Sequence, residues 1–172
     1  IVDEAHRLEG VLLSQLERSV SRGRFDEVLR LLGSARGRGR GSQGRGGGLL
    51  GRIGGYASPL LSRGASLPAD AAEMIGEMSG RIPRCREDVE RLLERMTPAA
   101  GPAEPYGARI RHRSAAELLG RDLEPLETVL AHCAAFAGAL QRLAGPLEGT
   151  GDKGIELSAE ALQIAARFRL LG

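Results

Sequence analysis

The sequence predicts a mainly α-helical fold, arranged as an antiparallel helical hairpin within a small bundle. Two long stretches repeat apolar residues at alternating spacings of four and three, the pattern of helices that pack along their whole length. Aromatic residues make up only 3% of the chain, so leucine, isoleucine, valine and alanine must build the core. That composition favours helices, because β-branched and aromatic residues concentrate in sheets.

The expected hairpin consists of two helices over residues 71–96 and 119–144, where the spacing of four and three is most regular. The apolar seam of the first helix is Ala71, Ile75, Met78, Ile82, Cys85, Val89, Leu92 and Met96, and that of the second is Leu119, Leu123, Leu126, Leu130, Cys133, Ala137, Leu140 and Ala144. Pro83 and Pro125 lie inside these two runs. Each is expected to kink its helix, because proline lacks a backbone N–H and its ring clashes with the preceding turn.

Helical patterns also flank the hairpin. Apolar residues recur at spacings of three to five over residues 7–32, with Gly23 as a potential break, and again over residues 158–171. These first and last helices would complete the bundle. A short, weaker helical pattern covers residues 49–64.

A glycine-rich, basic segment follows the first helical pattern. Eleven glycines lie between residues 33 and 55, and glycine loses more backbone entropy on ordering than any other residue. Little apolar surface before Leu49 offsets that loss, so residues 35–48 are expected to form a disordered loop. The chain has no acidic residue from Val28 to Ala69, an asymmetry typical of segments that face nucleic acid.

Two arginine clusters are candidate contacts to nucleic-acid phosphates, which attract basic side chains without sequence preference. One lies in and beside the glycine-rich loop, and the other lies in the connection between the two long helices. The alternative for the first cluster is a spacer that only keeps the chain soluble, since few aromatics accompany it. The candidate residues are Arg36, Arg38, Arg40, Arg45, Arg52, Arg109, Arg111 and Arg113.

An acidic string, Asp-Glu-Ala-His at residues 3–6, directly follows an apolar pair at residues 1–2. An apolar strand that ends in two carboxylates suits a Mg-ATP site. Asp3 would hold Mg²⁺ through water, because this ion prefers oxygen ligands and keeps several waters. Glu4 would position or deprotonate the attacking water. The alternative is a solvated acidic pair at a helix N-terminus.

Residues 1–9, Ile-Val-Asp-Glu-Ala-His-Arg-Leu-Glu, resemble the Walker B or DEAH box of ATP-dependent DNA helicases of the DinG/XPD type. In that family a large helical insertion, the arch, follows this box. The resemblance implies that residues 1–9 end a first motor domain and residues 10–172 form the arch-like insertion. It also implies that His6 couples nucleotide state to nucleic-acid binding. It further implies 5′-to-3′ unwinding powered by ATP hydrolysis, with ATP and Mg²⁺ as cofactors and single-stranded or forked DNA as partner.

Many members of that family also carry an iron–sulfur cluster, whose cysteines precede the box and so lie outside this chain. Cys85 and Cys133 match none of them. Neither has a CxxC partner, and both are expected to be small core residues. His132, beside Cys133, is assigned no ligand role.

The chain is expected to be a monomeric, cytoplasmic piece of a longer protein. It starts at Ile1, shows no secretory signal and has no run approaching the roughly 18 apolar residues of a membrane span. No Gly-x4-Gly-Lys-Ser/Thr phosphate loop occurs in it, so the isolated piece is expected not to hydrolyse ATP. Two other classes stay open: a non-catalytic helical nucleic-acid-binding domain with a chance acidic string, and a coiled-coil module completed by dimerisation.

Overall fold

The computed structural model describes residues 22–33, 48–61, 68, 70–96, 120 and 122–171. Every regular element among them is an α-helix, so the prediction of a mainly α-helical chain is confirmed. Three expected segments lie outside the described residues: the strand end at residues 1–2, most of the loop at 35–48, and residues 7–21 of the predicted 7–32 helix.

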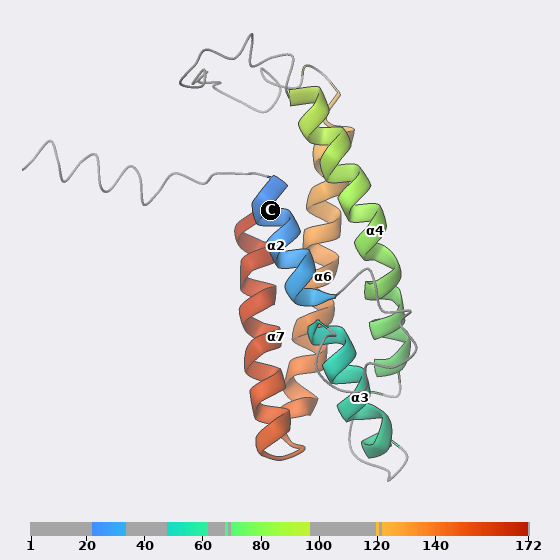
Figure 1. Cartoon of the computed structure of the whole chain (residues 1–172), viewed down its shortest axis with the longest axis vertical. Helices are drawn as coiled ribbons and strands as arrows, with labels where there is room; N and C mark the ends of the chain where they lie inside the picture. Colours follow the sequence, from blue (N-terminus) through green and yellow to red (C-terminus); the bar gives the residue numbers. More distant parts are fainter. Residues whose placement is uncertain are drawn as a thin grey trace, which may run out of the picture.

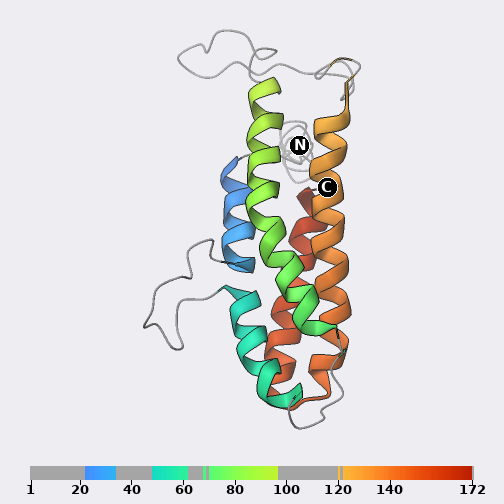
Figure 2. The same ribbon diagram turned by 90° about the vertical axis from the view of Figure 1, so that its right-hand side faces the viewer.

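The described helices stand side by side along one long axis (Figure 1). The first two, α2 and α3, follow one another in the same direction, and each packs against both α4 and α7. Helix α4 runs the opposite way, α6 runs back beside it, and α7 returns antiparallel to α6 (Figures 1 and 2). The helices are α2 (Arg22–Leu32), α3 (Leu49–Leu61), α4 (Ala71–Met96), α6 (Glu124–Glu148) and α7 (Asp152–Leu171).

Helix α6 lies at the centre of the core, because it packs against α4 on one side and α7 on the other. Its expected seam is buried at Cys133, Ala137, Leu140 and Ala144. A second buried set joins it at Val129, Phe136, Leu143 and Leu147. The ring of Phe136 stacks on that of Phe168 in α7, with centroids 4.9 Å apart. Helix α6 has two sets of buried residues because it packs against two neighbouring helices, α4 and α7.

The two prolines of the expected hairpin lie at different positions within their helices. Pro83 lies inside α4, and Figure 2 shows that helix changing direction along its length. Pro125 lies in the first turn of α6, so the expected internal kink there is wrong. The N–H groups of a first turn have no acceptor within the helix, and proline therefore loses nothing at that position.

A tight turn over residues 149–151 joins α6 to α7. Gly151 has φ +102°, a conformation that side-chain-bearing residues rarely adopt. The Thr150 hydroxyl donates to the Leu147 carbonyl at 2.6 Å, and the Tyr56 hydroxyl of α3 donates to the Thr150 carbonyl at 2.8 Å. A Cβ at Gly154 would overlap the Leu147 carbonyl oxygen. This close return starts α7 at Asp152, six residues before the expected start at Ser158.

Helices α2 and α3 meet where the glycine-rich segment leaves and re-enters the bundle. A Cβ placed on Gly48 would lie 2.7 Å from the Cα of Gly33 and 2.8 Å from the Leu32 carbonyl oxygen. The Gly48 carbonyl in turn accepts the first backbone hydrogen bonds of α3, from Gly51 and Arg52. Residues 34–47 thus start and finish at one point of the bundle.

Candidate functional site

Most residues of the predicted site lie outside the described part of the chain. This holds for the acidic string, Asp3, Glu4 and His6, and for all but one of the candidate arginines. The arginines outside are Arg36, Arg38, Arg40, Arg45, Arg109, Arg111 and Arg113. The structure therefore fixes where the basic segments are attached, and it places only Arg52 itself.

Arg52 lies on α3, and its guanidinium forms an ion pair with Glu160 of α7. Its side chain is 41% exposed and that of Glu160 is 29% exposed. The pair links two helices that are 108 residues apart in sequence. A phosphate at Arg52 would compete with the Glu160 carboxylate, so this arginine is less available than an unpaired one.

The base of the glycine-rich segment is defined by Gly33 and Gly48. A Cβ on Gly33 would lie 2.7 Å from Cδ1 of Ile82, so the junction rests on the middle of α4. The four arginines of residues 34–47 are tethered at this single point of the bundle.

The described surface is not basic. The described residues include thirteen arginine and lysine side chains and sixteen aspartate and glutamate side chains, a difference of minus three. The whole chain has a formal net charge of +2. Positive charge is therefore concentrated outside the described helices, and any attraction for polyanions must come mainly from those segments.

A polar pair is buried between α4 and α6. Nε2 of His132 and a carboxylate oxygen of Asp88 are 2.8 Å apart, and the two side chains are 11% and 16% exposed. Nδ1 of His132 is buried without a hydrogen-bond partner. An aspartate that orients a histidine can form part of a general base, whose other ring nitrogen then contacts a nucleophile or water. Here that nitrogen, Nδ1, is buried and has no hydrogen-bond partner among the described residues. The pair is a structural link between the helices.

Two buried thiols lie near this pair, Cys85 on α4 and Cys133 on α6. Burial raises the pKa of Cys85 to about 12, with smaller contributions from Cys133 and Asp88. Burial likewise raises the pKa of Cys133 to about 11. Both therefore stay protonated at neutral pH and are poor nucleophiles and poor metal ligands. Their expected role as core residues agrees with their burial.

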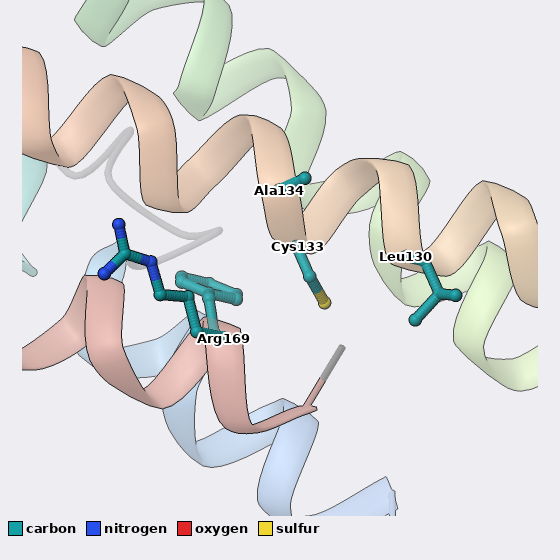
Figure 3. Close-up of a pocket in the computed structure, with 5 residues that line it drawn as sticks. Leu130, Cys133, Ala134 and Arg169 are labelled. Carbon is teal, nitrogen blue, oxygen red and sulfur yellow. The ribbon is translucent and has the colours of Figure 1, made fainter.

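A shallow cavity of about 300 Å³ lies between α6 and the end of α7 (Figure 3). Leu130, Cys133, Ala134 and Phe168 form its walls, and Arg169 stands at its edge. The walls offer a mostly apolar surface with one cation nearby. Apart from that guanidinium, the described residues that line the cavity offer no convergent polar groups of the kind that orient a substrate.

Among residues 22–33, 48–61, 70–96 and 122–171, no group of three histidine, cysteine, aspartate or glutamate side chains is arranged to hold a metal ion. No helix in this described part is long and apolar enough to cross a membrane. Comparison with protein-family models, curated proteins and solved structures found no match.

Proposed function

We propose that the chain belongs to an ATP-dependent DNA helicase with 5′-to-3′ polarity, in which residues 3–6 serve the nucleotide site and the helical bundle is the arch-like insertion. The observation that carries the proposal is the order of parts. An Ile-Val-Asp-Glu-Ala-His string precedes five described helices, with no strand among the described residues. A long helical insertion after this box is the feature that separates the DinG/XPD type from other helicases with the same box.

The acidic pair suits the chemistry of ATP hydrolysis. Asp3 offers the hard oxygen donor that Mg²⁺ prefers, with waters between ion and carboxylate. Glu4 holds and deprotonates the water that attacks the γ-phosphate, and His6 transmits nucleotide state to the DNA-binding parts. Binding of the phosphates needs a loop that these 172 residues do not contain, so the full-length polypeptide must supply it.

The bundle gives the proposed arch a rigid body with basic segments attached to it. One is tethered at Gly33 and Gly48 beside the middle of α4. Helix α4 ends and α6 begins at the end of the bundle opposite the 149–151 turn (Figure 1). Arg109, Arg111 and Arg113 lie between these two helices in sequence. Single-stranded DNA guided along the bundle would meet both segments through its phosphates.

Substitution of Glu4 in the full-length gene product tests the proposal. Glu4→Gln should lower DNA-stimulated ATPase activity by about 10²- to 10⁴-fold, since it removes the general base, while ATP binding persists. Glu17→Gln is the matched control, because it removes a carboxylate outside the nine residues that resemble the helicase box. Full activity in Glu4→Gln, or a gene that encodes no phosphate loop, would contradict the proposal.

The second candidate is a non-catalytic domain that binds nucleic acid. The net excess of positive charge outside the described helices favours it. Titration of a fluorescent single-stranded oligonucleotide with the 172-residue chain, over a salt series, tests it. Binding whose logarithm falls with log[salt], combined with no loss of ATPase in the Glu4→Gln gene product, would favour this function over the helicase.

A further inference from the structure

Helices α4 and α6 extend past α2 and α7 at the end of the bundle where α2 begins and α7 ends (Figure 2). Arg22, the first residue of α2, forms an ion pair with Glu90, and α4 continues for six residues beyond Glu90. Phe168, which stacks on Phe136, is three residues from the last residue of α7, whereas Phe136 is twelve residues from the first residue of α6. At this end, α4 and α6 therefore extend past their two neighbours.

Half-buried apolar side chains gather at this end of the bundle. They come from three helices: Met96 ends α4, Leu126 and Leu130 lie in the first turns of α6, and Leu171 ends α7. Leu130 also lines the cavity of about 300 Å³ between α6 and α7 (Figure 3). We call these four residues the open end of the core, because the described residues cover them only in part.

The opposite end of the core is covered. Leu147 and Leu157, on either side of the 149–151 turn, are at most 1% exposed. Tyr56 of α3 donates a hydrogen bond to the Thr150 carbonyl at 2.8 Å and so ties a third helix to that turn. Incomplete burial is thus a property of one end of the bundle, and a contiguous apolar surface of this kind is typical of a place where another element packs.

The sequence directly before α2 offers such an element. Its apolar residues at spacings of four are Leu8, Leu12, Leu16 and Val20, which we call the N-terminal stripe. They belong to the part of the expected 7–32 helix that lies outside the described residues. As a helix, residues 8–20 would span about 18 Å, against about 9 Å for the six residues by which α4 extends past Glu90. The segment is therefore long enough to cover the open end.

The N-terminal stripe is out of step with the buried face of α2. Val20 and Phe25 are five residues apart, which separates them by about 140° around a helix, whereas residues four apart differ by about 40°. A straight continuation of α2 would therefore point the stripe away from the bundle, and a change of direction just before Arg22 turns it inward. Glu27 of α2 pairs with Arg167 of α7 at 2.9 Å, so Arg22 lies near the end of α7, beside the open end.

We propose that residues 8–20 of this chain cover the open end of the core, with the N-terminal stripe packed against Met96, Leu126, Leu130 and Leu171. A segment tethered at Arg22 acts at an effective concentration in the millimolar range, so it occupies this surface ahead of a second copy of the chain. This inference does not depend on the helicase proposal, because it involves neither ATP nor DNA.

Residues 97–117 also lie outside the described part of the chain and follow directly after α4. They are rich in proline and glycine, and their only large apolar side chains are Tyr106 and Ile110. The N-terminal stripe offers four aliphatic side chains in regular helical spacing, so it suits an apolar surface better.

Tryptophan fluorescence tests the contact, because the chain has no tryptophan of its own. In the 172-residue chain at about 1 µM, far below the effective concentration of a tethered segment, Leu16→Trp should emit at short wavelength and resist quenching by acrylamide. Ser14→Trp is the matched control on the opposite side of the expected helix, and it should be quenched freely. Equal quenching at the two positions would overturn the proposal. Protection of Leu16→Trp that appears only as the protein concentration rises would assign the stripe to a second copy and would overturn it as well.

Cys133 reports the same contact without an added probe, because it lines the cavity beside Leu130 whereas Cys85 does not. Leu12→Ser/Leu16→Ser should raise the rate at which iodoacetamide labels Cys133 at least about tenfold, since loss of buried leucines shifts a local opening by that factor or more. The rate at Cys85 should stay unchanged, which separates local exposure from general unfolding.

Ser14→Ala/Arg18→Ala is the control on the polar side of the segment and should alter neither rate. An unchanged rate at Cys133 in the leucine variant would overturn the proposal. Faster labelling of Cys133 in Ile110→Ser, with none in the leucine variant, would show that residues 97–117 cover the open end instead.

Discussion

Asp88 on α4 accepts a hydrogen bond from Nε2 of His132 on α6, with the two atoms 2.8 Å apart. Asp88 also meets Arg91 at 3.0 Å, an exposed pair on its own helix. The imidazole must therefore carry its proton on Nε2, and Nδ1 remains buried without a partner. The interhelical hydrogen bond stabilises the bundle, because its loss would leave a second buried ring nitrogen of His132 without a partner.

Asp88→Ala should destabilise the bundle by about 1–3 kcal/mol, the cost of a buried polar group that loses its partner. Addition of His132→Leu should recover part of that loss, because the unpaired imidazole is then gone. Urea unfolding followed by circular dichroism measures both. Arg91→Ala is the control, since it removes only the exposed pair and should cost less than about 0.5 kcal/mol. Equal small losses for Asp88→Ala and Arg91→Ala would show that the interhelical bond contributes little.

The junction of α2 and α3 makes a second prediction. Gly48→Ala should cost about 1–3 kcal/mol, because its Cβ would meet the backbone of Leu32 and Gly33 and rigid backbone cannot give way. Gly51→Ala, one turn later in α3, has nothing within 4 Å of its Cβ and should stabilise the chain by about 0.5–1 kcal/mol. Thermal unfolding of the two variants gives opposite signs if the junction is as close as described. A neutral Gly48→Ala would contradict it.

The same junction predicts that residues 34–47 can be removed. Because Gly33 and Gly48 are adjacent, a four-residue Gly/Ser linker can replace the segment without separating α2 from α3. A shorter loop costs less entropy to close, so the free energy of unfolding should change by no more than about 1 kcal/mol. The linker variant should also bind single-stranded DNA more weakly and with a shallower salt dependence, since four arginines are lost. Collapse of the helical signal in that variant would show that the segment supports the bundle.

The mainly helical character and the buried seams could be predicted from the sequence because spacing along a helix is a local property. In α4 the expected residues are buried, except Ile75 and Met96, which are half-buried; the buried ones are Ala71, Met78, Ile82, Cys85, Val89 and Leu92. In α7 the expected inner residues Leu157, Ala161, Ile164 and Phe168 are buried too. Each of these positions lies one helical turn from the next, so no knowledge of distant parts was needed.

The side-chain contacts between helices could not be predicted, because they depend on which helix faces meet. His132 and Asp88 are 44 residues apart, and nothing in their spacing within each helix indicates the bond. The exposed residues Ile155, Leu162 and Leu170 of α7 follow the same helical spacing as its buried residues. Only the positions of α2, α3 and α6 therefore determine which side of α7 is buried. Of the predicted site, Arg52 alone falls among the described residues, and its ion pair with Glu160 was not indicated by local sequence.

The two buried thiols predict that stability falls in mildly alkaline solution. Burial raises the pKa of Cys133 to about 11 and that of Cys85 to about 12, whereas both thiols titrate near their ordinary value when the chain is unfolded. Above about pH 9 the unfolded chain releases these protons and the folded chain keeps them, so unfolding becomes more favourable as pH rises. The stabilising contribution is complete below the unfolded pKa and is lost through about pH 9–11 for Cys133, continuing toward pH 12 for Cys85.

Each such thiol steepens the decline by at most about 1.4 kcal/mol per pH unit. Urea unfolding at pH 8, 9 and 10 should therefore show a steeper loss in the native chain than in a Cys85→Ala/Cys133→Ala variant, whatever the lower starting stability of that variant. The two chains differ only at these two thiols, so the contributions of all other groups cancel in the comparison. Parallel pH profiles would mean that the thiols reach solvent through local opening of α6 from α4. In that case iodoacetamide should label them in the folded chain at rates approaching those in urea, whereas the packed interface predicts labelling only after unfolding.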